Sequence, residues 1–450
     1  MRHVPHRGTA ARRLVVCALI ASGALGAAAC GGHSNGDGPT DGAADNSQHG
    51  GADGSLSSLG DDAGGQGSDQ DGQALDDEGN PPDGSTTSYD AGANDASFHF
   101  DGGYPAGWLY TSGAAIYESN GTGGGTPWVG RGVNVDDLFM CGYDNTLWMA
   151  DAGGALKQEY ATLMAQWKPS FVRISLSMDS EKDNSGNPFI VSWLSDPSQY
   201  KTPMTAVINA LAGYPGVHVL VTLRSDASMI GQDPNNDPEA TGIPSSSTTT
   251  PNATKFPTGT DAVYVALVDT FGTSSAVMFG LTNEPGGNTA SNSTLAAAMN
   301  HAVGAIRAEE TRLGLPHHIV SVQGNSWTSN IAFYATANGT TYPDGGTGLI
   351  TYDNVVYEVH GYPPTPTEYT FPNIPVIIGE YGSLPTNDAG TDPAFFADLE
   401  AKKIPSLAWD FDSYNDCAPD LVDVNQSPTN ITPTTPWGTM VQSYLLAHAP

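Results

Sequence analysis

The chain has 450 residues, and its 48 aspartates and glutamates against 16 lysines and arginines give a formal net charge of −32 at neutral pH. A surface this acidic repels nucleic acids and anionic lipid headgroups, so we expect neither as a partner and favour a neutral or cationic one. The length is ample for one large hydrophobic core.

The first 29 residues have the pattern of an export signal. Several arginines precede an apolar run over residues 14–29, which is shorter than a typical membrane span and ends in small residues. The run LGAAAC at residues 25–30 resembles a bacterial lipobox, which predicts cleavage before Cys30 and acylation of its thiol. The alternative is ordinary cleavage after Ala29 with release. We therefore expect a cell-surface or periplasmic lipoprotein that meets the membrane only through its N-terminal lipid, or else a secreted protein.

Residues 30–103 form a second region of distinct composition. The segment is rich in glycine, aspartate and serine, has very few large apolar residues, and contains no lysine or arginine. Such a composition cannot bury enough surface to offset chain entropy, so we expect a disordered spacer. The alternative is a calcium-binding tract, but the aspartates lack the repeat that a metal loop needs. We expect one folded domain over residues 104–450 and a monomer.

Within residues 104–450, β-rich apolar runs alternate with helical patterns. Eight strands with intervening helices predict an α/β fold, a parallel (β/α)8 (TIM) barrel. A predicted hairpin at residues 109–121 precedes the first strand, and we expect it to plug the floor of this barrel. The alternative to the barrel is an open doubly wound sheet, for which no glycine-rich phosphate fingerprint is present. The predicted strands are 129–135, 171–176, 217–223, 277–282, 318–324, 355–360, 376–379 and 407–411, and the predicted helices are 154–167, 204–211, 262–271, 294–313 and 393–403.

Two loops of the predicted barrel carry further expectations. Cys141 follows the first strand and Cys417 follows the eighth. Because these strands are neighbours in a closed barrel, and because an exported protein meets oxidising conditions, we expect a disulfide between the two cysteines, with two unpaired thiols as the alternative. The long polar segment 225–261 follows the third strand, where it would form a wall or lid of the site.

Two acidic motifs each end an apolar run. Residues 277–285 read VMFGLTNEP and residues 374–382 read IPVIIGEYG, so each motif predicts a buried strand with a glutamate at its C-terminal tip. These glutamates are Glu284 and Glu380. Acetal hydrolysis needs such a pair, one carboxyl group as proton donor and the other as nucleophile, about 5 to 5.5 Å apart in retaining enzymes and about 6.5 to 9.5 Å apart in inverting ones. The sequence therefore predicts a glycosidase.

The strand ends also carry motifs that resemble a known family. From the hairpin at Leu109 to the strand of Trp409, the chain resembles glycoside hydrolase family 5, a family of retaining (β/α)8-barrel glycosidases that includes many cellulases and mannanases. The resemblance implies that Glu284 is the acid/base and Glu380 the nucleophile. The matching residues are RGVN at 131–134, Arg173, Asn283, Glu284, His360, Tyr362, Glu380 and Trp409.

The resemblance also implies substrate-binding roles, each with a structural alternative. Arg173 would orient the nucleophile, or be an ordinary salt-bridge partner. Asn283 would bind the substrate 2-hydroxyl. Trp409 would lie beneath the reacting sugar, or simply fill the core.

Three more side chains complete the expected site. His360 and Tyr362 would be the sixth-strand pair, with Tyr362 donating a hydrogen bond to the nucleophile; a core histidine and a packing aromatic are the alternatives. Trp327, after the fifth strand, is either a second sugar platform or a packing residue. No cluster of histidine, cysteine and acidic residues has metal-ligand spacing, so we expect no metal and no cofactor.

One departure from the family pattern concerns the sugar that is cleaved. The third strand is followed by Arg224 and Asp226, where the family commonly has a histidine that touches substrate. We expect a retaining endo-β-1,4-glucanase acting on a polysaccharide or oligosaccharide. The alternatives are a β-mannanase, an exo-β-glucanase, a transglycosylase with the same residues, and a barrel that binds carbohydrate without cleaving it.

Overall fold

A computed structural model describes residues 103–135, 137, 154–177, 193, 200–224, 260–285, 291–336, 350–382, 393–411, 419–423, 429 and 431–450. The predicted signal peptide, Cys30 and the spacer up to residue 102 lie outside these residues, as do Cys141, Cys417 and most of segment 225–261. The export signal, the lipid, the spacer and the disulfide therefore stay predictions. No helix among the described residues is both long and apolar enough to cross a membrane.

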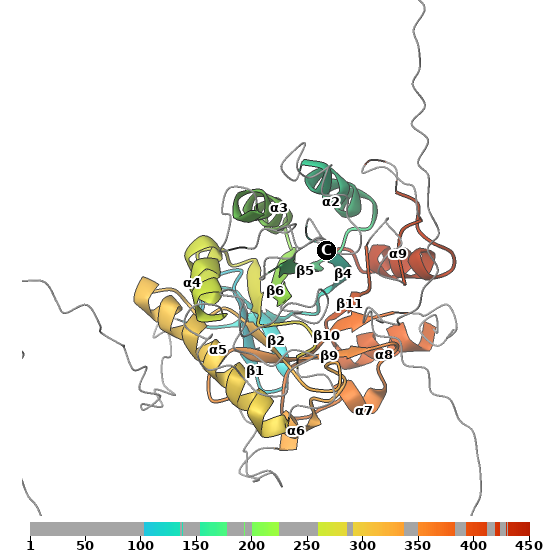
Figure 1. Ribbon diagram of the computed structural model, residues 1–450. Helices are drawn as coiled ribbons and strands as arrows, with labels where there is room; N and C mark the ends of the chain where they lie inside the picture. Colours follow the sequence, from blue (N-terminus) through green and yellow to red (C-terminus); the bar gives the residue numbers. More distant parts are fainter. Residues whose placement is uncertain are drawn as a thin grey trace, which may run out of the picture. The chain divides into compact units, whose positions relative to one another are not determined.

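Eight parallel strands close into a barrel, as the alternating pattern predicted, and the open sheet is therefore wrong (Figure 1). The strands follow one another around the barrel in chain order, and the last pairs with the first through Leu407 and Gly132. The barrel strands are β4 (Arg131–Val135), β5 (Phe171–Ser177), β6 (His218–Arg224), β7 (Val277–Gly280), β8 (Val320–Gln323), β9 (Val355–Gly361), β10 (Val376–Tyr381) and β11 (Ser406–Ala408).

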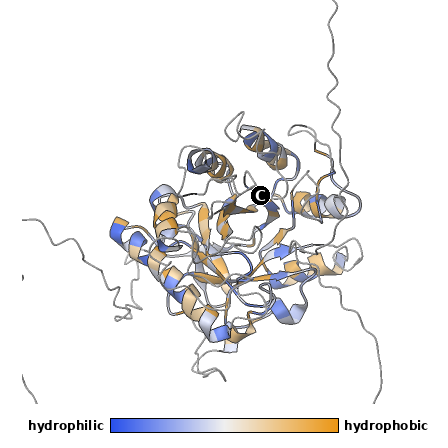
Figure 2. Ribbon diagram, viewed as in Figure 1, coloured by the Kyte–Doolittle hydropathy of each residue, from blue (hydrophilic) through white to orange (hydrophobic). Residues whose placement is uncertain are grey.

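Helices surround the strands in Figure 1, and apolar residues concentrate on the strands in Figure 2. The five predicted helices are confirmed to within two residues at each end. Among the described residues, three further helices were not predicted: α6 and α7 are very short, whereas α9 buries Trp437, Val441 and Tyr444 at helical spacing. The described helices are α2 (Gly154–Gln166), α3 (Thr202–Ala212), α4 (Thr260–Phe271), α5 (Asn292–Leu313), α6 (Ala332–Thr336), α7 (Pro366–Tyr369), α8 (Pro393–Lys402) and α9 (Trp437–Ala447).

The predicted hairpin is present and has a third strand. It consists of β1 (Leu109–Ser112), β2 (Ala115–Ser119) and β3 (Gly125–Pro127), in an antiparallel sheet. Leu109 and Ile116 from this sheet pack in one apolar cluster with residues near the starts of the barrel strands, such as Phe171. Asn354, just before β9, accepts a hydrogen bond from the Thr111 N–H at 2.8 Å. The sheet therefore closes the N-terminal end of the barrel.

One step further along the strands, the barrel interior becomes polar. Arg173, Ser321 and Glu358 are fully buried there. Gly379 on the neighbouring strand β10 leaves room for the Glu358 side chain, because a Cβ atom at this position would come 1.9 Å from the Glu358 Oε1. A charged layer therefore lies between the apolar floor and the open C-terminal end of the strands.

Candidate active site

The two predicted carboxylates come from strand ends that are not neighbours in the barrel. Glu284 follows β7, and Glu380 lies near the end of β10. Both residues are buried, with 8% and 4% of their surface exposed. One carboxylate oxygen of Glu284 lies within 4.8 Å of one of Glu380. The structure therefore brings the two predicted carboxyl groups together inside the barrel.

A backbone irregularity aims Glu380 into the barrel. Along β10 the pairing with β9 runs from Ile378, opposite Val359, directly to Glu380, opposite His360, so that Gly379 is an extra residue. Strict alternation would send Ile377 and Gly379 inward and Glu380 outward. The bulge shifts this alternation by one residue and turns the carboxylate inward, which is a known use of bulges beside active sites.

Glu284 occupies a backbone conformation that non-glycine residues seldom adopt, with a φ of 46°. Its backbone N–H donates to the side-chain oxygen of Gln323 at 2.6 Å, and the Thr328 hydroxyl donates to the same oxygen at 3.0 Å. Burial raises the pKa of the Glu284 carboxyl group, and the charge of Glu380 adds to this effect against the hydrogen bond from His360. Glu284 therefore holds a proton more readily than an exposed glutamate does.

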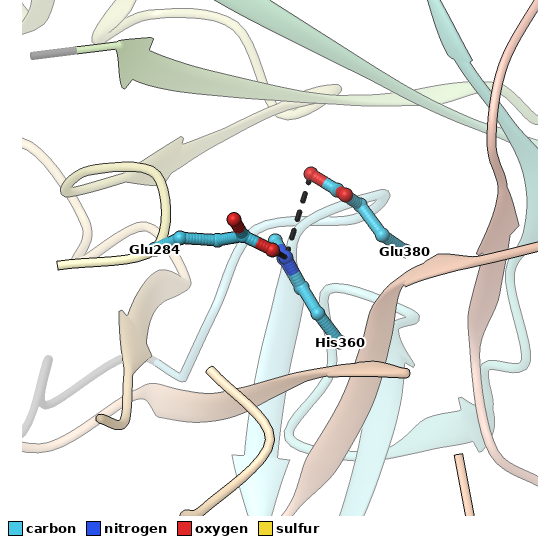
Figure 3. Close-up of side chains that lie close together, drawn as sticks. All are labelled: Glu284, His360 and Glu380. Carbon is cyan, nitrogen blue, oxygen red and sulfur yellow. Dashed lines mark hydrogen bonds and ion pairs between the residues drawn. The ribbon is translucent and has the colours of Figure 1, made fainter. Parts of the chain in front are cut away.

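His360 approaches both carboxylates from β9 (Figure 3). Its Nδ1 lies 3.0 Å from the Glu284 Oε1 and 3.4 Å from the Glu380 Oε1. Its Nε2 lies 2.9 Å from the Glu358 Oε1. Burial lowers the pKa of His360, but the charge of Glu380 and the bonds to Glu284 and Glu358 together raise it to about 9. These contacts therefore favour the imidazolium form of the ring.

Arg173 on β5 joins four other side chains inside the barrel. One terminal nitrogen donates to the Glu380 Oε1 at 3.0 Å and to the Asn134 Oδ1 at 2.9 Å. The other donates to the Asn283 Oδ1 at 2.7 Å, and Nε forms an ion pair with Glu358 at 3.0 Å. A planar guanidinium with several fixed donors suits this position, because lysine could not reach all four partners at once.

Tyr362 donates a hydrogen bond to the second oxygen of Glu380, at 2.7 Å. Burial and the charge of Glu380 raise the pKa of the Tyr362 hydroxyl well above its ordinary value, so the hydroxyl keeps its proton. Each oxygen of Glu380 therefore receives a hydrogen bond, one from Arg173 and one from Tyr362.

Trp409 and Trp327, the two predicted sugar platforms, differ in burial and in backbone conformation. Trp409 directly follows β11 and is buried, and its backbone N–H donates to the Tyr381 carbonyl oxygen at 2.8 Å. Trp327 is half-buried, in a turn where Ser326, Trp327 and Thr328 have φ values of 55°, 51° and 60°. The Thr328 carbonyl oxygen accepts a hydrogen bond from the His360 N–H at 3.2 Å, so the backbone of this turn is tied to the site.

Sequence reasoning missed Glu358 and Gln323. Glu358 contacts His360, and Gln323 accepts a hydrogen bond from the Glu284 N–H. A signal for Glu358 exists in the sequence, because it lies two residues before His360 and so faces the same side of the strand. Gln323 offers no such signal, since a polar residue at a strand end has many possible roles. The Arg224 side chain and Asp226, which follow the third predicted strand where the family commonly has a histidine, lie outside the described residues.

The same cluster has a geometry that a metal ion could use. Glu284, His360 and Glu380 each offer one ligand atom within 4.8 Å of the others. However, both ring nitrogens of His360 already face carboxylates, and Arg173 adds a positive charge beside Glu380. Positive charge disfavours a cation here, so the arrangement is better described as a site for proton transfer.

Comparison with known proteins gives one family match and several similar structures. The sequence matches the family Cellulase (glycosyl hydrolase family 5) over residues 129–415. A structure from Cytophaga hutchinsonii is 17% identical with a TM-score of 0.53, covering 76% of this chain and 96% of its own. The catalytic domain of a Thermobifida fusca endoglucanase is 14% identical, with a TM-score of 0.51 and coverages of 76% and 97%. A β-mannanase from Streptomyces thermolilacinus is 18% identical, with a TM-score of 0.48 and coverages of 76% and 98%. No curated protein matches the sequence.

Proposed function

This chain belongs to glycoside hydrolase family 5, a family of retaining glycosidases, and from that premise we propose that it is an endo-β-1,4-glucanase with Glu284 as acid/base and Glu380 as nucleophile. The observation that carries the proposal is the unequal environment of two adjacent carboxylates. Burial raises the pKa of Glu284, whereas Arg173 and Tyr362 each donate a hydrogen bond to Glu380. Such a difference supports Glu284 as the acid and Glu380 as the nucleophile.

The reaction would proceed in two displacements. In the first, a Glu380 oxygen attacks the anomeric carbon while Glu284 gives its proton to the leaving glycosidic oxygen, which produces a glycosyl-enzyme ester and a free sugar end. In the second, Glu284 takes a proton from water, the water oxygen attacks the anomeric carbon, and the bond to Glu380 breaks. Two inversions at the same carbon retain the configuration.

The substrate is proposed from the family and from the residues around the two carboxylates. The family description names cellulases. Because Arg173 holds the oxygen of Asn283, the amide nitrogen of Asn283 would donate to the 2-hydroxyl of the reacting sugar. Trp409 and Trp327 would offer aromatic faces to sugar C–H groups, and the acidic chain suits a neutral polymer. A substrate outside the cell fits the proposed export signal and lipid on Cys30.

The test is the release of reducing ends by the chain without its export signal. The panel is carboxymethyl cellulose, mixed-linkage glucan, galactomannan and xylan, with Glu380→Gln as the paired variant. We expect release from the glucans and a loss of at least about 10⁴-fold in Glu380→Gln, since residues that act as one catalytic unit fail together. Release from galactomannan alone would make the protein a β-mannanase. No release from any polymer by folded protein would favour a binding barrel, and activity that survives in Glu380→Gln would contradict the nucleophile.

A further inference from the structure

The fully buried carboxylate of Glu358 has no part in the two displacements. It lies on β9, two residues before His360, and does not reach the two reacting carboxylates directly. Its Oε2 accepts a hydrogen bond from the Ser321 hydroxyl at 2.6 Å. Its Oε1 lies 2.9 Å from the His360 Nε2 and 3.0 Å from the Arg173 Nε. The absence of a side chain at Gly379 leaves room for this carboxylate.

We propose that Glu358 is a positioning residue that keeps His360 protonated on both ring nitrogens, so that the acid proton of Glu284 remains directed to the leaving oxygen. The inference rests on the proposed role of Glu284 as acid/base. Glu358 acts through His360 and does not itself touch the substrate.

The argument begins with the two faces of the imidazole ring. Nε2 faces the carboxylate of Glu358, and a carboxylate accepts hydrogen bonds, so this nitrogen carries a proton. A neutral ring has only one N–H, which would leave a bare lone pair on Nδ1, 3.0 Å from Glu284. Protonated Glu284 would then donate its proton to His360. A second proton on Nδ1 reverses this bond, because Nδ1–H donates to Glu284 and leaves the acid proton for the substrate.

The charges around His360 support the doubly protonated ring. The carboxylates of Glu358, Glu380 and Glu284 face it from β9, β10 and the end of β7, and Arg173 lies across the barrel. Although burial opposes ionisation, Arg173 and His360 lower the pKa of Glu358 to about 2, so its charge is permanent. With Glu284 protonated, the charges of Glu358 and Glu380 balance the imidazolium of His360 and the guanidinium of Arg173. Without the Glu358 charge, the pair of cations would face Glu380 alone, and His360 would lose its proton more easily.

A second buried carboxylate in the same chain provides a matched control. Glu310 on α5 is also fully buried, its Oε1 lies 2.7 Å from the His318 Nδ1, and its Oε2 accepts from Arg307 at 2.6 Å. Its side chain bonds to Arg307 and His318 and not to the two proposed catalytic carboxylates. Glu310→Gln therefore removes a buried charge of the same kind at a place remote from the reaction.

The kinetic test uses Glu358→Gln, which keeps the shape of the side chain and removes its charge. Aryl β-cellobiosides with a poor phenol leaving group need the acid proton, whereas dinitrophenyl β-cellobioside does not. Since general acid catalysis contributes about 10²- to 10⁴-fold, we expect kcat/KM to fall at least about 10-fold more for the poor leaving group than for the good one. Glu310→Gln should change both rates by the same factor. An equal loss for both substrates in Glu358→Gln would overturn the proposal.

A second measurement is independent of activity and does not use Glu358→Gln. Nitrogen NMR of isotope-labelled histidine, with the His360 signal assigned by its loss in His360→Gln, reports which ring nitrogens carry protons. We expect both to be protonated in the wild-type protein at neutral pH. A neutral His360 would overturn the inference. If the wild type cleaves no glycan or glycoside, the proposed function fails, while this NMR result still decides the state of His360.

Discussion

Two buried networks in this chain consist of the same three residue types, but we infer a structural role for one and a catalytic role for the other. Glu310, His318 and Arg307 form one where α5 packs against the barrel, before β8 begins. Glu358, His360 and Arg173 form the other inside the barrel. In each, a fully buried glutamate lies within hydrogen-bond distance of a histidine and an arginine. The comparison shows that burial, charge and residue type alone do not distinguish a structural network from a site.

The difference lies in where the remaining donors point. Beyond its bond to Glu310, Arg307 donates to the backbone carbonyl oxygens of His318, Asp353 and Asn354, at 3.0, 2.9 and 3.2 Å. These acceptors carry no proton and undergo no reaction. Among the described residues, the one further carboxylate that Arg307 approaches, that of Asp353 at 3.8 Å, is exposed and pairs with His317 instead of a second carboxylate. We infer that it serves stability.

In the barrel network, the remaining donors point instead to carboxylates at the strand ends. Arg173 continues to Glu380, and His360 continues to both Glu284 and Glu380. A carboxyl group can lose, gain or share a proton, and its nucleophilicity depends on its charge. A buried ionic network therefore becomes a candidate for catalysis where it ends on further titratable groups that substrate can reach.

After Glu380→Gln, the largest expected effect comes from Glu284→Gln, which removes the proposed acid and leaves the rest of the barrel network. Polymer hydrolysis should fall about 10²- to 10⁴-fold because the leaving oxygen receives no proton. With a dinitrophenyl glycoside, formation of the glycosyl-enzyme should persist and its hydrolysis should become slow, giving a burst of dinitrophenolate. Stopped-flow absorbance measures the burst. A uniform loss with no burst would contradict the assignment of Glu284.

Glu310→Gln is the corresponding change in the other network, and it should affect stability instead of the chemical step. Removing one partner of a buried ion pair leaves Arg307 uncompensated, which typically costs about 3 to 5 kcal/mol. Urea unfolding measures the loss, and kcat at a temperature where both proteins are folded is the control. A large fall in kcat for folded protein would remove the distinction between the two networks.

Tyr362→Phe sharpens the comparison within the catalytic network. The change removes one hydrogen bond to the ionised Glu380 and leaves the Arg173 contact in place. A hydrogen bond to a charged group contributes about 1.5 to 3 kcal/mol, so kcat/KM should fall roughly 10- to 100-fold. Steady-state kinetics on the preferred polymer tests this. An unchanged kcat/KM would assign Tyr362 to packing.

The smallest effect concerns the pH dependence of stability. Burial opposes ionisation of Glu310, but Arg307 and His318 lower its folded-state pKa below the ordinary value. Its contribution is therefore present above the unfolded-state pKa and is lost as pH falls through the lowered folded-state pKa. The difference in unfolding free energy between wild type and Glu310→Gln should narrow below about pH 4.3, the ordinary glutamate pKa. Urea unfolding of both proteins from neutral to acidic pH measures this difference. A difference that stays constant with pH would mean that the charge of Glu310 does not contribute to stability.

The sequence alone was sufficient for the order of elements and for the main carboxylates. The eight strands are visible because each is a short apolar run, and α5 is visible because its apolar spacing ends at Gly314, which has a left-handed φ of 67°. Glu284 and Glu380 are visible because each follows such a run. These signals are local, so no knowledge of distant contacts is needed to find them. Helix α9 carries an equally local signal, which the sequence reasoning did not use.

Only the tertiary structure decided how the site is assembled. The bulge that turns Glu380 inward depends on the register between β9 and β10, and the left-handed backbone of Glu284 depends on Gln323 from a different strand. The pairing of Glu358 with Arg173 spans the interior of a closed barrel. Each of these features joins residues that are far apart in the chain. Local propensity contains no information about which distant groups become neighbours, and barrel closure supplies it.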